Sequence, residues 1–346
     1  MKKIDQYFLE ALCCFLENRR VEWDDVTNEE WVELFRMAKE HNVLPMIYEA
    51  VYTCSAIKKA DPSLVGSYKR MMLREVMMQT MKTEEFYQLN RHLKAAGVRF
   101  LAVKGIVCRS MYPKPDCRPS SDEDLILAPG EFEKCHQAML DFGMVVSNPQ
   151  SDLLNDYEIP YGKPGSPLYI EIHKSLFPEG SEAYGELNRY FAHIFDEKTE
   201  KKMISVNGNE ISTMQDTQHL FYLICHAFKH FLHSGFGIRQ VCDIIMYANV
   251  EGKNVDWQLL LAYCKEIHAE LFSAAIFRIG KKYLVFDEEK AGYPMEWKCM
   301  EVDETAMLED LLDAGIYGDS EMSRKHSSNI TLNAVVADKR VEKLPL

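Results

Sequence analysis

The stretch Asp122-Glu123-Asp124-Leu125-Ile126-Leu127 decides the fold of the middle of the chain. Its apolar second half predicts a short strand. Side chains alternate between the two faces of a strand, so Asp122 and Asp124 point to one side and Glu123 to the other. Two neighbouring carboxylates are costly unless a cation lies between them, and their hard oxygen atoms suit Mg²⁺. The stretch therefore predicts a divalent metal site, with a solvent-exposed acidic strand edge as the alternative.

Two further strands are predicted, one before this stretch in the sequence and one after it. The apolar run 98–103 ends at Lys104-Gly105, where a short helix begins. Glycine lets the backbone approach a phosphate, and a helix N-terminus favours negative charge. The run 168–173 alternates apolar and polar residues, which is typical of a half-buried strand. Pairing of that strand with the acidic one would place Glu171 beside the two aspartates.

The remainder of the chain carries mostly helical patterns. Apolar residues recur at helical spacing, and Thr27 with Glu30 forms the signature of a capping box. The methionine-rich part of the long helix predicted over 64–95 looks like a buried core face. We expect an α+β fold with a small mixed β-sheet core and helical flanks. The predicted regions are an N-terminal helical region at 1–95, the α+β core at 96–200 and a C-terminal helical region at 201–346.

Charge restricts the partners of the protein. The 346 residues include 40 basic and 53 acidic side chains, which gives a net charge of −13. This excess of acid argues against non-specific binding of long nucleic acid and against docking on anionic lipid. A small anionic substrate stays compatible, because residues 99–118 hold one acid and five basic residues. These basic residues are Arg99, Lys104, Arg109, Lys114 and Arg118.

Hydropathy and cysteine usage indicate the compartment. No run of about 18 apolar residues exists, so we expect no membrane-spanning segment. The ten cysteines are scattered and form no CxxC pair, which weakens a zinc-finger interpretation. We expect a cytoplasmic chain whose thiols are reduced and mostly buried.

Several of these features together resemble a known family. The spacing is similar to that of the uncharacterised nucleotidyltransferase-like family, which belongs to the polymerase-beta-like nucleotidyltransferase superfamily. The residues that carry the resemblance are Lys104-Gly105, Tyr112-Pro113, Arg118-Pro119, Asp122, Asp124, Glu171 and His173. His226, His230 and Asp243 resemble the family's helical half. The resemblance covers roughly residues 30 to 280.

The resemblance implies a metal-dependent nucleotidyltransferase. Such an enzyme transfers a nucleoside monophosphate from a nucleoside triphosphate to a hydroxyl group of a small molecule or a protein. Asp122, Asp124 and Glu171 would be the catalytic residues and the ligands of one or two Mg²⁺ (or Mn²⁺) ions. Glu171 would also help to deprotonate the acceptor hydroxyl. Two metal ions of this kind stabilise both the attacking and the leaving oxygen.

The resemblance also implies a set of substrate-binding residues. Gly105 would let the backbone approach the phosphates, and Lys104 and Arg118 would neutralise their charge. His173 is the fourth member of the set, as a partner of the carboxylates, with a structural histidine as the alternative.

Two positions depart from the pattern of the superfamily. Ile106 stands where a small hydroxyl residue usually follows the glycine, and Glu123 stands where an apolar residue usually separates the aspartates. A buried Glu123 needs a partner. One alternative is therefore a degenerate nucleotidyltransferase fold that binds a nucleotide or a protein without catalysis. A helical interaction protein with an incidental Asp-x-Asp motif is a further alternative.

Overall fold

The computed structural model describes residues 1–199, 201–233 and 236–314. The chain divides into two compact units, and each unit is assembled from separate stretches of sequence. The helical unit comprises residues 1–76, 111–119 and the described part of 220–346, and the sheet unit comprises residues 77–110 and 120–219.

The three regions predicted from the sequence are, in contrast, consecutive along the chain. They describe the order of element types, and as a division into domains they stay a prediction. The end of the C-terminal region, 315–346, lies outside the described residues.

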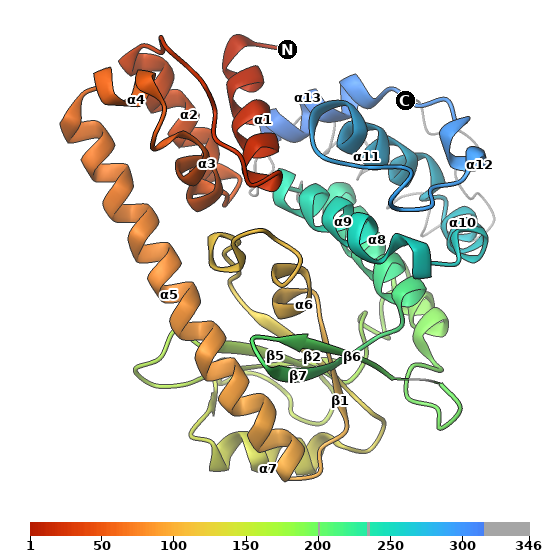
Figure 1. The fold of residues 1–346 in the computed structure, drawn as a ribbon. Helices are drawn as coiled ribbons and strands as arrows, with labels where there is room; N and C mark the ends of the chain where they lie inside the picture. Colours follow the sequence, from red (N-terminus) through yellow and green to blue (C-terminus); the bar gives the residue numbers. More distant parts are fainter. Residues whose placement is uncertain (200, 234–235, 315–346) are drawn as a thin grey trace. The chain divides into compact units, whose positions relative to one another are not determined.

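The sheet unit is built on a mixed sheet of seven strands within the described residues (Figure 1). Their order is β3-β4-β5-β2-β1-β7-β6. The strands are β1 (Phe100–Val103), β2 (Glu123–Leu127), β3 (Val145–Val146), β4 (Glu158–Gly162), β5 (Tyr169–His173), β6 (Lys202–Val206) and β7 (Asn209–Thr213). Strand β2 pairs antiparallel with β1 and parallel with β5. The predicted α+β fold with a mixed sheet is confirmed.

Burial is greatest in the middle of the sheet. All residues of the central strands β1 and β2 are buried, whereas the edge strands β3 and β6 are partly exposed. Strands β6 and β7 form a hairpin on Asn207-Gly208, where both residues have positive φ, the geometry that the Asn-Gly signature predicts. This hairpin lies after residue 200, yet β7 pairs with β1 and extends the sheet.

Two helices lie side by side in the sheet unit. These are α7 (Phe132–Asp141) and the C-terminal part of α5 (Pro62–Ala95), which begins in the helical unit (Figure 1). The ring of His92 on α5 is within hydrogen-bond distance of the carbonyl oxygen of Ala138 on α7, at 3.0 Å. The unit also contains the short helix α6 (Gly105–Arg109) and the 3-10 helix η2 (Gly185–Phe191).

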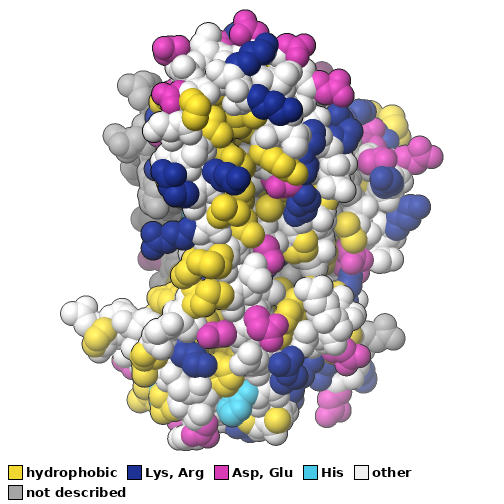
Figure 2. All heavy atoms as spheres, turned by 60° about the vertical axis from the view of Figure 1, so that its left-hand side comes forward, with side chains coloured by type: hydrophobic (Ala, Val, Ile, Leu, Met, Phe, Trp, Pro, Cys, Tyr) yellow, Lys and Arg dark blue, Asp and Glu magenta, His cyan; other side chains and the backbone are white. Residues whose placement is uncertain are grey.

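The methionine-rich part of α5 corrects one expectation. Met72 is buried, but Met77, Met78 and Met81 are exposed. Figure 2 brings the side of α5 forward and shows hydrophobic side chains gathered there among Lys and Arg. The prediction of a buried core face was therefore wrong for these three residues, because helical periodicity alone does not show which face is covered.

The helical unit contains most of the helices. They are α1 (Lys3–Leu16), α2 (Asn28–Glu40), α3 (Leu44–Val51), α4 (Ser55–Lys59), α9 (Ile238–Glu251), α10 (Trp257–Glu266), α11 (Glu270–Tyr283), α12 (Met295–Lys298) and α13 (Glu304–Ala314), with 3-10 turns η1 (Pro115–Cys117) and η3 (Gly252–Asn254). Helix α8 (Asp216–His233) begins in the sheet unit and continues here. The predicted capping box at the start of α2 is confirmed, since Thr27 and Glu30 exchange both hydrogen bonds.

A buried ion pair fastens the segment 111–119 to the rest of the helical unit. Arg118 donates from Nε to Asp243 Oδ1 at 2.9 Å and from Nη2 to Oδ2 at 2.5 Å. The hydroxyl of Tyr112 donates to the same Oδ1 at 2.7 Å. All three side chains are buried. The Tyr-Pro and Arg-Pro dipeptides thus serve this attachment to α9.

Cysteine usage agrees with the expectation of free, mostly buried thiols. All ten cysteines are unpaired, and only Cys13 and Cys299 are not fully buried. None of the helices in the described part of the chain is both long enough and apolar enough to cross a membrane.

Removal of Asp243 should destabilise the helical unit. In Asp243→Ala, the Arg118 guanidinium stays buried without its carboxylate, which costs about 3–5 kcal/mol. We expect a clearly lower melting temperature by calorimetry. The double variant Arg118→Met/Asp243→Leu, which removes both charges, should recover much of the loss. Equal melting temperatures for wild type and Asp243→Ala would contradict this role.

Candidate metal centre

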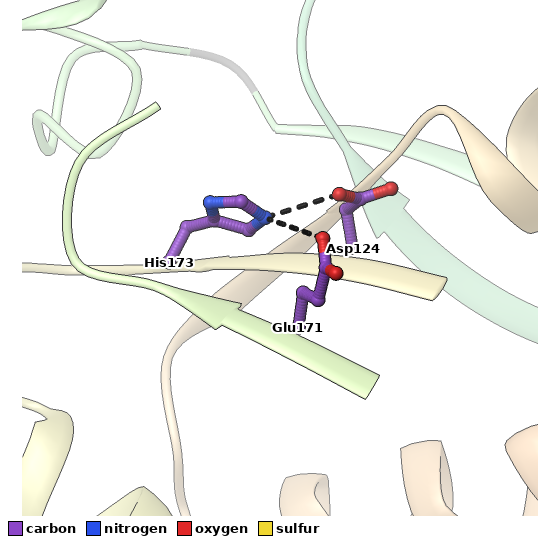
Figure 3. A group of neighbouring side chains, drawn as sticks. All are labelled: Asp124, Glu171 and His173. Carbon is purple, nitrogen blue, oxygen red and sulfur yellow. Dashed lines mark hydrogen bonds and ion pairs between the residues drawn. The ribbon is translucent and has the colours of Figure 1, made fainter. Parts of the chain in front are cut away.

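Strand register brings Asp124 and Glu171 together. In the parallel pair β2–β5, Asp124 is the partner of Glu171, and Glu123 is the partner of Ile170. Register partners share a face of the sheet, so Asp124 and Glu171 lie on one face. His173 follows two residues later on β5 and points to the same face (Figure 3).

These three residues form a compact group of metal-ligating atoms. One ligand atom each from Asp124, Glu171 and His173 lies within 4.8 Å of the others. Asp122 is not a member of this group, although its charge acts on Glu171. Two carboxylates and an imidazole are donors that a divalent cation accepts. The chemistry of the donor set therefore fits a metal ion.

Asp124 is buried and ionised. Burial by itself would raise the pKa of its carboxyl group, but Lys104 and His173 outweigh that effect and lower the pKa to about 2. Lys104 Nζ and His173 Nε2 both lie 3.0 Å from Asp124 Oδ1. The aspartate thus carries a negative charge that Lys104 partly offsets.

The pKa of Glu171 indicates that the group of Asp124, Glu171 and His173 lacks positive charge. Burial raises the pKa of Glu171 to about 8, and the charges of Asp122, Asp124 and Glu158 add to the effect. Lys104 acts in the opposite direction but does not outweigh them. A divalent cation would favour the ionised form of Glu171.

Lys104 has a strained backbone. Its φ of 52° and ψ of −118° belong to a region that favours glycine. Strain of this kind costs about 1–3 kcal/mol and is concentrated at functional sites. The conformation is held from the N-terminal side by His219, whose Nε2 accepts the Lys104 N–H at 3.2 Å. Burial lowers the pKa of His219 to about 3, so this ring is neutral and able to accept.

Glu123 holds the same turn from the C-terminal side. Its Oε2 accepts the N–H of Ile106 at 2.6 Å, and its Oε1 accepts from Arg109 Nη2 at 2.6 Å. Ser120 Oγ also donates to Glu123 Oε1, at 3.2 Å. Both charged side chains are fully buried. The departure from an apolar residue at position 123 is thus explained by a partner, Arg109.

Gly105 is required by this carboxylate. A Cβ atom at position 105 would lie 2.1 Å from Glu123 Oε2. The close approach to Gly105 that was predicted for a phosphate is therefore made by Glu123. Binding of a phosphate by Gly105 stays a prediction.

The basic residues of 99–118 do not form one free patch. They belong to both units, and each of them pairs with a carboxylate. The pairs are Arg99–Glu131, Lys104–Asp124, Arg109–Glu123, Lys114–Glu49 and Arg118–Asp243. Arg118 lies in the helical unit, and its role in substrate binding stays a prediction.

Sequence reasoning missed three residues of the site. Arg109 and His219 support the Lys104 turn, and Glu158 approaches the ring of His173 at 3.7 Å from Oε2 to Nδ1. A buried acid in a central strand does predict a nearby arginine. No local signal points to His219 or Glu158, because both contacts depend on tertiary pairing.

Two substitutions of Lys104 distinguish the effect of its charge on stability from the effect of its backbone strain. Lys104→Gly and Lys104→Ala both remove the ion pair with Asp124, but only glycine accepts the backbone angles without strain. We expect Lys104→Gly to be more stable by about 1 kcal/mol, because the strain of about 1–3 kcal/mol exceeds the entropy cost of glycine, about 0.5–1 kcal/mol. Urea denaturation measures the difference, and an alanine variant at least as stable as the glycine variant would refute the strain.

Glu171 should make stability depend on pH in metal-free buffer. Its pKa is about 8 in the folded protein and near the ordinary glutamate value of 4.5 when unfolded. The folded state therefore binds this proton more tightly, and the resulting stability is lost as the pH rises from about 4.5 to about 8. We expect the melting temperature of wild type to fall over this range relative to Glu171→Gln. Parallel curves for the two proteins would contradict the raised pKa.

Comparison with known proteins identifies the family. No curated protein matches the chain. Among solved structures, the chain is similar to an antigenic nucleotidyltransferase-like protein from Paracoccidioides brasiliensis, at 13% identity and a TM-score of 0.35, over 62% of this chain and 96% of that chain. The sequence profile of the uncharacterised nucleotidyltransferase family matches residues 27–284. Because this match spans most of the sequence, the chain belongs to the uncharacterised nucleotidyltransferase family.

Proposed function

We propose that the protein is a metal-dependent nucleotidyltransferase that transfers a nucleoside monophosphate from a nucleoside triphosphate to a hydroxyl group of a small molecule or protein. The bond between the α-phosphorus and the oxygen that bridges to the β-phosphate breaks, and pyrophosphate leaves. The observation that carries the proposal is the register pair Asp124–Glu171, which joins two carboxylates on one face of a mixed sheet. Membership of the family supports the reaction class.

The chain's own residues have distinct roles in this proposal. Asp124 and Glu171 hold the divalent cation, Mg²⁺ or Mn²⁺, and Asp122 lies close enough to Glu171 to contribute its charge. When bound, the cation supplies charge stabilisation for the transferring phosphoryl group. Glu171, once ionised, accepts the proton of the acceptor hydroxyl. Lys104 contacts Asp124, and in this proposal it neutralises a phosphate of the bound nucleotide.

The acceptor is small or a protein side chain in this proposal. The net charge of −13 disfavours a long polyanion. The basic residues of 99–118 strengthen the argument, since each is already paired with a carboxylate.

One observation favours a second candidate, the degenerate fold that binds without catalysis. Glu123 accepts the Ile106 N–H at the start of α6, and Lys104 already neutralises Asp124. Both contacts place internal groups where a nucleotide or metal would otherwise find partners. The two candidates differ in whether a label leaves the nucleotide.

Transfer of label from α-³²P nucleoside triphosphates tests the reaction. With Mn²⁺ or Mg²⁺ and a fractionated extract of small molecules and proteins, we expect label on an acceptor for wild type. Asp124→Asn should lower the rate by roughly 100-fold or more, the size expected when an electrostatic contact in the transition state is lost. Asp141→Asn, an exposed acid on α7, is the matched control and should behave as wild type.

The outcomes separate the candidates. Nucleotide binding by titration calorimetry without any transfer supports the degenerate binder and overturns the enzyme. Equal transfer by Asp124→Asn and wild type rejects the proposed site.

A further inference from the structure

His173 has a carboxylate at both edges of its ring. Its Nε2 is 3.0 Å from Asp124 Oδ1 and 4.0 Å from Glu171 Oε2. Its Nδ1 is 3.7 Å from Glu158 Oε2 and has no hydrogen-bond partner among the described residues. The antiparallel pairing of β4 with β5 sets this arrangement, because Glu158 is the register partner of His173. Only 4% of the ring is exposed, so little water reaches it.

A neutral imidazole can donate a hydrogen bond to only one of these carboxylates. It has one N–H and one bare lone pair, so one nitrogen always presents its lone pair to a carboxylate. A cation on the Nε2 side removes the conflict. It accepts the Nε2 lone pair together with oxygens of Asp124 and Glu171, and the proton then lies on Nδ1 and faces Glu158.

The two distances from His173 Nε2 agree with a single ion at this place. Two ligand atoms that lie about 2.1 Å from an ion are about 3.0 Å apart at right angles and about 4.2 Å apart when opposite. The separations of Nε2 from the two carboxylate oxygens, 3.0 and 4.0 Å, fall in this range. Figure 3 shows the ring edge directed at both carboxylates.

We propose that His173 is the third protein ligand of this cation, through Nε2, and that Glu158 is its positioning residue. Imidazole is a softer donor than carboxylate, so the site prefers Mn²⁺ to Mg²⁺. The inference rests on the proposed function, in which Asp124 and Glu171 hold the cation. It adds a ligand and a metal preference that the three-carboxylate site expected from the sequence does not contain.

Pulsed electron paramagnetic resonance of the Mn²⁺-loaded full chain tests the ligand without any substitution. We expect a ¹⁴N modulation for wild type that changes to a ¹⁵N signal when the protein is labelled with ¹⁵N-histidine. His173→Gln should lose the modulation, and the matched control His193→Gln, an exposed histidine, should keep it. Bound Mn²⁺ without nitrogen modulation in wild type overturns the inference.

Affinity measurements test the metal preference and the role of Glu158. By calorimetry we expect His173→Gln to lower the ratio of Mn²⁺ to Mg²⁺ affinity by about 10-fold or more. Glu158→Gln should weaken Mn²⁺ binding by about 10–100-fold, as for other partners of metal-bound histidines, yet keep the nitrogen modulation. The exposed Glu133→Gln is the control. Unchanged Mn²⁺ affinity in Glu158→Gln overturns the positioning role.

These readouts fail separately from the proposed function. Absence of any bound divalent cation overturns both the metal-dependent reaction and this inference. If Mn²⁺ binds and label is transferred, but no nitrogen modulation is seen, the proposed enzymatic activity stands and only the role of His173 as a ligand is overturned.

Discussion

The parallel register of β2 and β5 is the constraint on which the site depends. It places Asp124 directly beside Glu171 within the sheet, where burial strengthens the repulsion between their charges. Two features reduce that repulsion. Lys104 approaches Asp124, and Glu171 holds a proton more tightly than a glutamate in water. The group therefore has less positive charge nearby than its two carboxylates would need if both were ionised.

A further buried carboxylate, that of Glu123, stabilises the turn that carries Lys104. Glu123 faces away from Asp124, because neighbouring residues of a strand alternate, and it ties Arg109 to the start of α6. With His219 on the other side, it keeps Lys104 in a conformation that a lysine seldom adopts. The strained backbone of Lys104 therefore lowers the stability of the folded protein, and it fixes the position of the Lys104 ammonium group. Backbone strain of this kind is common at functional sites.

Local patterns in the sequence predicted the parts of this account that depend on near neighbours. Alternation placed the two aspartates apart from Glu123. The need of a buried acid for a partner predicted that Glu123 is paired, but it did not identify Arg109 as the partner. Contacts between residues far apart in the sequence could not be predicted from local patterns. Arg118 pairs with Asp243, 125 residues away, so the basic cluster of 99–118 looked free when it was not. Glu158 reaches His173 only through strand register, which no single segment encodes.

The central claim is that Asp124, Glu171 and His173 bind one divalent cation. A crystal soaked in MnCl₂ and measured at the manganese absorption edge tests it most directly. The account predicts one anomalous peak at bonding distance from Asp124, Glu171 and His173 Nε2. A crystal without a peak at this place, with Lys104 Nζ still next to Asp124 at high Mn²⁺ concentration, would contradict it.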